Sequence, residues 1–248
     1  MCLNGFAMLF VTFIVLPAIA VAWALWLIDN PVPQIFGLAV LAFIFLLGCG
    51  GYFTQQPNES RVMIFFGKYR GTCHKVGYYW VNPFLTKKKI SLRIRNMDID
   101  PIKVNDKVGN PVMIGMVLVW RVKDTYKVIF DLDAASLSAA QGGGVRTSAL
   151  DNFVRIQRDA ALREVTGHFA YDPQPDAPEE LTLRDGGEII NDLLEKKINE
   201  RLAMAGIEVV EARLNYLAYA PEIAPVMLRR QQASAIITAL EKIVEGEV

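Results

Sequence analysis

Between Met1 and Asn58 the sequence has a single charged side chain, Asp29, although the chain of 248 residues contains 26 Lys and Arg and 26 Asp and Glu. Two uncharged runs flank Asp29, one from Leu3 to Leu27 and the other from Ile35 to Phe53. An apolar helix of about 20 residues crosses the ~30 Å hydrocarbon layer of a bilayer, and both runs are long enough. The segment 29–34 between the runs contains two prolines, which favour a turn. The sequence therefore predicts an N-terminal transmembrane helical hairpin.

Two other interpretations of the first run fit the residues less well. A cleaved signal peptide has a basic start and an apolar stretch about half as long. A buried hairpin in a soluble core would need non-polar surroundings on every side. We therefore expect large side chains of both runs to be embedded in the membrane, namely Phe10, Phe13, Leu16, Trp23, Trp26, Phe43 and Phe45. Tyr52 and Phe53 end the second run, where an aromatic belt is expected.

Basic residues are distributed asymmetrically around the two runs. No Lys or Arg precedes or interrupts them, whereas Arg61, Lys68, Arg70 and Lys75 follow closely. Since basic residues flanking spans tend to stay in the cytoplasm, we expect an integral membrane protein with its soluble domain on the cytoplasmic side. The turn at Asp29 then lies outside or dips into the bilayer.

The remainder of the chain, from Glu59 onward, carries all the other charges and has ordinary globular composition. The balance of charge excludes the basic footprint of a nucleic-acid-binding protein. Three scattered Cys and two His offer neither a disulfide framework nor a zinc cluster. We therefore expect no nucleic-acid partner, no cofactor and no metal.

Hydrophobic periodicity predicts that the soluble part contains both strands and helices. Alternation predicts strands at 61–66, 78–81, 90–94, 112–122 and 207–218, with glycines 71 and 77 in a turn and another turn at 105–110. Helical spacing predicts helices at 126–130, 134–141, 145–168 and 190–202, with Gly142–Gly144 as a joint and an exposed loop at 172–186. We assign 1–54 to the membrane anchor, 55–220 to the soluble domain and 221–248 to a last helix that starts at Pro221.

The last helix has one apolar face. Val226, Ala233 and Leu240 are seven residues apart, and Ile236 and Ile243 fall between them. Both a coiled coil and a single amphipathic helix agree with this spacing. We expect contacts between copies of the chain through Ile236, Ile237, Leu240 and Ile243. No Gly-Pro stop signal ends the pattern, so a longer native helix is also an expectation.

Candidate catalytic groups are sparse, and we assign none. Cys73 and His74 are adjacent, so on a strand they point to opposite faces. Asp98 and Asp100 share a strand face, as a pair of solvated carboxylates or a metal-binding pair does. A membrane-anchored hydrolase that uses Asp98, Asp100 or Cys73 is the alternative function. A transport component is a third, although neither apolar run contains the ionisable residues that transport favours.

Several segments of the soluble part resemble the Band 7 or SPFH domain family, which includes stomatin, prohibitin and flotillin. These segments, in family order, are Arg61–Tyr69, Gly77–Phe84, Val104–Val112, Val119–Val122, Gly206–Arg213 and Tyr219–Ala224. The resemblance covers about residues 55 to 245. The chain differs from many relatives in its double apolar run, its enlarged loop at 172–178 and its shorter last helix.

The resemblance implies an α+β domain, with a mixed sheet and helices, that acts as a non-enzymatic scaffold. Such a protein forms a large membrane-bound homo-oligomer, a ring or cage, that organises lipids or partner membrane proteins in a membrane microdomain. Many members regulate a membrane protease or a channel, so such a protein is also an expected partner, beside the lipid bilayer.

Overall fold

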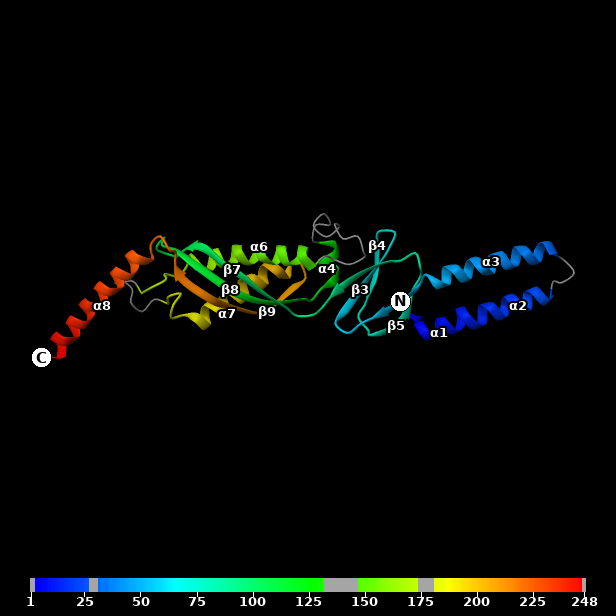
Figure 1. Cartoon of the computed structure of the whole chain (residues 1–248), viewed down its shortest axis with the longest axis horizontal. Coiled ribbons are helices and arrows are strands. Elements are labelled where there is room, and N and C mark those ends of the chain that lie inside the picture. The colour runs from blue at the N-terminus through cyan, green and yellow to red at the C-terminus, as the bar shows by residue number, and fades with distance from the viewer. Residues whose placement is uncertain (1–2, 27–30, 132–146, 174–180, 247–248) are drawn as a thin grey trace. The chain divides into compact units, whose positions relative to one another are not determined.

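The computed structural model describes residues 3–26, 31–131, 147–173 and 181–246 (Figure 1). The chain divides into two compact units. One comprises Met1–Arg93 and Val122–Arg146, and the other comprises Ile94–Arg121 and Thr147–Val248. The helix predicted at 134–141 and the glycine joint that follows it lie outside the described residues.

The first unit begins with apolar helices. Helix α1 (Gly5–Phe10), the π-helical turn η1 (Val11–Val15) and helix α2 (Leu16–Trp26) follow one another without a break. Together they confirm an apolar N-terminal helix, because Gly5–Leu25 is long and apolar enough to cross a membrane. Helix α3 (Pro31–Cys49) is also apolar, and its stretch Ile35–Cys49 is shorter than a full span.

Two small antiparallel sheets follow in the same unit. In the first, β5 (Gly77–Trp80) lies between β1 (Leu3–Asn4) and β2 (Tyr52–Gln55). In the second, β3 (Glu59–Phe65) lies between β4 (Lys68–Cys73) and β6 (Thr86–Ser91). The short helix α4 (Thr125–Phe130) contacts β3 and confirms the predicted helical turn. One hydrophobic core cluster of this unit consists of Phe53, Met63, Cys73 and Val81.

Three sequence predictions in this unit are wrong. Phe53 is a core residue on β2, 6% exposed, and not part of an aromatic belt. Gly71 was predicted to lie in a turn, but it lies inside β4, a strand that pairs with β3. The strand predicted at 90–94 ends at Ser91, because Leu92 donates its backbone N–H to Asn58 instead of to a neighbouring strand.

The second unit is a three-stranded sheet covered by helices. Strand β8 (Pro111–Val122) lies between β7 (Arg95–Asn105) and β9 (Ile207–Tyr219). The register joins Asn105 to Pro111, which confirms the predicted turn between these strands. The alternating residues of β8 predicted to share a face are all buried, namely Val112, Ile114, Met116, Leu118, Trp120 and Val122.

Helices α6 (Thr147–Thr166) and α7 (Gly187–Ala203) pack against each other and along this sheet (Figure 1). The apolar stripe predicted on α7 is buried, with Ile190, Leu194, Ile198 and Leu202 each at most 1% exposed. The last helix, α8 (Ala224–Gly246), starts three residues later than predicted. Pro221 lies in a preceding turn, in which Ile223 donates its backbone N–H to the carbonyl of Ala220.

Candidate functional site

Both ends of the apolar region are attached to the same strand, β5. Leu3, just before α1, pairs with Trp80 on one edge of β5. Tyr52, just after α3, pairs with the same Trp80 on the other edge. An antiparallel strand has two hydrogen-bonding edges, so β5 can hold both segments at once. The chain therefore enters and leaves its apolar helices at one place, which we call the β5 junction.

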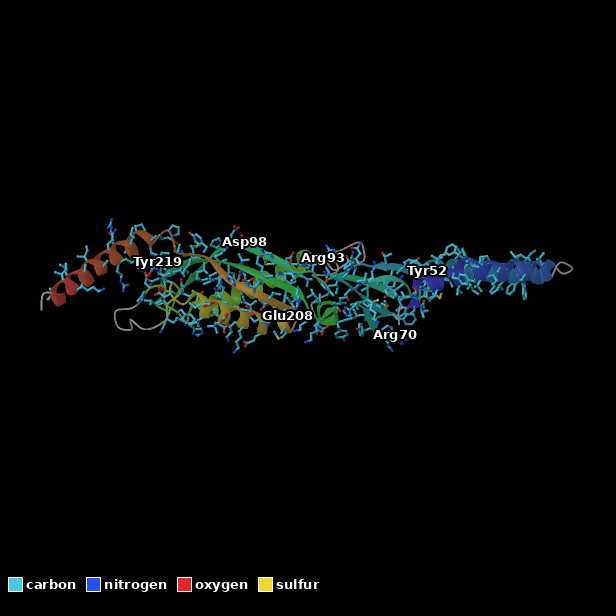
Figure 2. The ribbon with its side chains drawn as sticks, turned by 90° about the horizontal axis from the view of Figure 1, so that it is seen from below. Tyr52, Arg70, Arg93, Asp98, Glu208 and Tyr219 are labelled. Atoms are coloured by element: carbon cyan, nitrogen blue, oxygen red, sulfur yellow. The ribbon has the colours of Figure 1, made fainter. Side chains whose placement is uncertain are left out.

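Polar groups at the β5 junction are hydrogen-bonded across the chain. The indole Nε1 of Trp80 donates to the carbonyl oxygen of Gly48, 2.8 Å away, in the last turn of α3. The Tyr52 hydroxyl donates to Oγ1 of Thr12 at 2.9 Å, and this Oγ1 donates to the carbonyl of Met8. Tyr52 lies where the apolar helices meet the strands (Figure 2). Trp and Tyr with one apolar and one hydrogen-bonded end are typical of membrane–water interfaces.

The apolar helices also contact each other. The rings of Phe13 and Phe45 meet edge to face with centroids 5.6 Å apart. Gly37 lies so close to Trp23 that an added Cβ would be 2.3 Å from the indole nitrogen. Small residues allow helices to approach closely in membranes.

The residues predicted to be membrane-embedded lie on these helices. Phe10 and Phe43 are more than half exposed, Trp23 is also exposed, and Leu16 and Phe45 are half-buried. The side chain of Trp26 lies outside the described part. Contact of these side chains with lipid remains a prediction.

Helix α8 exposes the apolar face on which the predicted oligomer contacts lie. Ile236, Ile237, Leu240 and Ile243 are each 57–61% exposed. Val244 extends the same face and is also exposed. An amphipathic helix usually buries such a face against another surface. A contact between copies remains a prediction.

Asp172 joins the base of α8 to the sheet, and the sequence analysis missed it. Its Oδ2 accepts hydrogen bonds from the hydroxyl of Tyr219 on β9 at 2.8 Å and from Nε2 of Gln231 on α8 at 2.5 Å. Its Oδ1 is 3.6 Å from Nη1 of Arg184. Figure 2 shows Tyr219 near the start of α8. The sequence of 172–186 indicated only an exposed loop, and no local pattern predicted that Asp172 would bind Tyr219 and Gln231.

The Tyr219 hydroxyl is held in its neutral form. Burial raises the pKa of Tyr219 well above its usual value, and the hydrogen bond to the Asp172 carboxylate and its negative charge act in the same direction. Burial also raises the pKa of Tyr171, whose ring centroid is 4.1 Å from that of Tyr219. A raised pKa stabilises the folded chain below the unfolded value of about 10, and this stabilisation is lost as the pH rises toward the folded pKa.

Tyr219→Phe is therefore expected to make the free energy of unfolding depend less on pH in the alkaline range. At pH 8 the free energy of unfolding of the variant should be lower by about 1 kcal/mol, because the hydrogen bond to Asp172 is lost. Above pH 10 the difference in stability from the unmodified chain should shrink, because only the unmodified chain must then keep the phenol at position 219 neutral. Thermal unfolding between pH 8 and 11 measures this. Tyr126→Phe, which removes a hydroxyl from an exposed ring, is the control.

The candidate catalytic residues do not form a site. Cys73 is buried in the core of the first unit beside Phe53, while His74 is exposed. Asp98 is exposed on β7, where its Oδ1 accepts a hydrogen bond from Nδ2 of Asn215 at 3.0 Å (Figure 2). Across the described residues, no group of three or more His, Cys, Asp or Glu side chains is arranged to hold a metal ion.

The chain matches a model of a protein family. The family model described as SPFH domain / Band 7 family matches residues 54–248. No curated protein matches the chain.

Proposed function

Because the SPFH domain / Band 7 match covers 54–248, the chain belongs to this family, and we propose that it is an integral-membrane scaffold that assembles into a large oligomer. Members of the family are generally membrane-associated scaffolds without enzymatic activity. The assembly organises lipids or partner membrane proteins, and regulation of a membrane protease or channel is one form that this function takes.

The β5 junction carries the proposal of a hairpin anchor. If only Gly5–Leu25 crossed the bilayer, Leu3 and Trp80 would lie on opposite sides and could not pair. Pairing of β1 and β2 with one strand requires that the chain return to the side from which it entered. Helix α3 has 19 residues, about 28 Å at 1.5 Å per residue, which is close to the hydrocarbon thickness.

The exposed face of α8 supports the proposal of assembly. Tethering confines the chain to a surface, so that weak contacts between helices act at a high effective concentration. Repeated head-to-tail contacts around an axis close into a ring. We propose that Ile236, Ile237, Leu240 and Ile243 form these contacts, and that the oligomer is a ring or cage.

The basic residues after the anchor favour a soluble domain on the cytoplasmic side of the membrane.

A membrane-anchored hydrolase is not favoured. Its candidate nucleophile, Cys73, lies in a core, and its candidate carboxylate, Asp98, is bound to Asn215.

Single-cysteine variants in sealed inside-out vesicles test the anchor. One variant keeps only the native Cys2, and two others carry His74→Cys or Asp29→Cys as their only thiol. We expect a membrane-impermeant maleimide added outside to label Cys2 and position 74 without detergent. Position 29 should react only after the vesicles are opened, because it lies on the far side.

Labelling of Cys2 and position 74 from opposite sides would show a single span and overturn the hairpin. Failure of position 29 to react even in opened vesicles, with full reaction after solubilisation in detergent, would show a turn inside the bilayer.

A further inference from the structure

Two cationic side chains lie over one ring beside the β5 junction. The guanidinium carbon of Arg61 on β3 is 4.9 Å from the centroid of the Phe53 ring. The Nζ of Lys87 on β6 is 5.5 Å from the same centroid. Both side chains are half-buried, so that part of each remains accessible. We call Arg61 and Lys87 the cation pair.

The cation pair lacks a neutralising carboxylate. In the described part of the chain, neither side chain has an acidic group within ion-pair distance, and Nε of Arg61 is buried without a hydrogen-bond partner. The nearby Lys89 differs, because its Nζ is 2.7 Å from Oε1 of Glu59. Burial, together with the charge of Arg61, lowers the pKa of Lys87. Two like charges in a partly buried place favour an anion that would relieve their repulsion.

The position of the cation pair, next to the end of α3, favours a lipid phosphate as that anion. Nζ of Lys87 donates to the carbonyl of Gly51 at 3.2 Å, two residues after α3 ends at Cys49. Trp80 donates to Gly48 at the same end of α3. If α3 lies in the hydrocarbon layer, its end lies at the boundary with the headgroups. The cation pair is then at the depth of lipid phosphates.

A largely apolar cavity lies near the cation pair, although Arg61 and Lys87 do not line it. Met63, which is opposite Lys87 in the β3–β6 register, contributes to its wall. The cavity has a volume of about 590 Å³, and its other lining residues include the apolar Leu3, Trp80 and Leu85 together with the polar Arg70 and Asn82. A phospholipid has a charged phosphate next to an apolar glycerol and acyl region, which matches this arrangement.

From this geometry we propose that Arg61 and Lys87 bind the phosphate of an anionic phospholipid at the foot of the anchor. The proposal rests on the proposed membrane scaffold and adds a specific lipid site to it. Arg offers a planar fork and Lys a point charge, and both are common phosphate ligands. The bound lipid would join the end of α3 to strands β3 and β6 within the first unit.

The test uses the full chain in mild detergent with short-chain phosphatidylglycerol or phosphatidylcholine, and native mass spectrometry to count bound lipid. The variant is Arg61→Gln with Lys87→Gln. Its matched control is Lys75→Gln with Lys88→Gln, which removes the same charge from the same unit. Lys88 neighbours Lys87 on β6, and its side chain points to the opposite face of the sheet.

We expect the unmodified chain and the control to prefer phosphatidylglycerol, and the Arg61/Lys87 variant to lose affinity for it by about tenfold or more relative to the control. A tenfold loss corresponds to about 1.4 kcal/mol, which is less than a single hydrogen bond to a charged group can contribute. Equal losses in both variants would show diffuse surface attraction and overturn the site. Displacement of the lipid by equimolar inorganic phosphate would identify a free anion as the ligand, and would overturn the lipid assignment.

The outcome is separable from that of the proposed scaffold. Absence of lipid preference in a chain that still forms a hairpin and a large assembly would refute this site alone. Cysteine labelling that shows a single span, or a monomeric mass in detergent, would refute the scaffold regardless of the lipid result.

Discussion

Leu240→Glu combined with Ile243→Glu is expected to reduce the proposed large assembly in detergent to small species. Both side chains are more than half exposed on α8. Burial of a Leu or Ile contributes about 1.5–3 kcal/mol, so the loss of two at each contact weakens it by about 100-fold or more. Two added carboxylates increase the effect, because buried unpaired charges are costly. Light scattering coupled to size-exclusion chromatography measures the assembled mass.

The matched control for this variant is Ala235→Glu combined with Lys242→Gln. It changes the net charge by the same amount, and both positions are exposed on the side of α8 opposite to Leu240. The control should keep the mass of the unmodified assembly. An unchanged mass for the Leu240/Ile243 variant would exclude α8 as the contact, and a loss of mass in both variants would indicate a general effect of charge.

Gly51→Ala should clearly destabilise the β5 junction. An added Cβ would lie 2.3 Å from the carbonyl oxygen of Val81 and 2.4 Å from Nε1 of Trp80. The backbone cannot move without breaking the hydrogen bond between Val81 N–H and the Gly51 carbonyl, which is 3.1 Å long. Overpacking of this kind costs about 1–3 kcal/mol. Thermal unfolding in detergent should show a midpoint about 5 °C lower.

Gly50→Ala is the control next to it in the sequence. Its added Cβ would lie 3.4 Å from Cβ of Pro83, which is an ordinary contact. The midpoint should change little, since such substitutions usually stay within about 0.5 kcal/mol. Equal effects of the two substitutions would mean that the close approach at Gly51 does not contribute to stability.

Regular periodicity was a reliable guide to the second unit. Every fourth residue of α7 from Ile190 to Leu202 is apolar, and every second residue of β8 from Val112 to Val122 is apolar. Both sets are buried as predicted. A helix of 3.6 residues per turn and a strand of period 2 each direct such residues to one face, so their burial needs no knowledge of the partner.

Irregular elements were predicted less well. Gly71 was assigned to a turn, although it continues β4 through pairing with β3. Phe53 was assigned to the membrane run because it is apolar and follows Tyr52, yet it lies in a core formed with Met63 and Val81. Hydropathy alone does not distinguish lipid from a protein interior, because both remove a ring from water.

The sequence by itself determined the apolar N-terminal helix, the α+β class and the family, because charge distribution, local periodicity and motif order are properties of consecutive residues. Only the tertiary structure decided which distant segments meet. Leu3 and Tyr52 share β5 as a partner, and Asp172 accepts hydrogen bonds from residues 47 and 59 positions further along the chain. Such pairings depend on chain topology and on side-chain geometry in three dimensions, which no local pattern encodes.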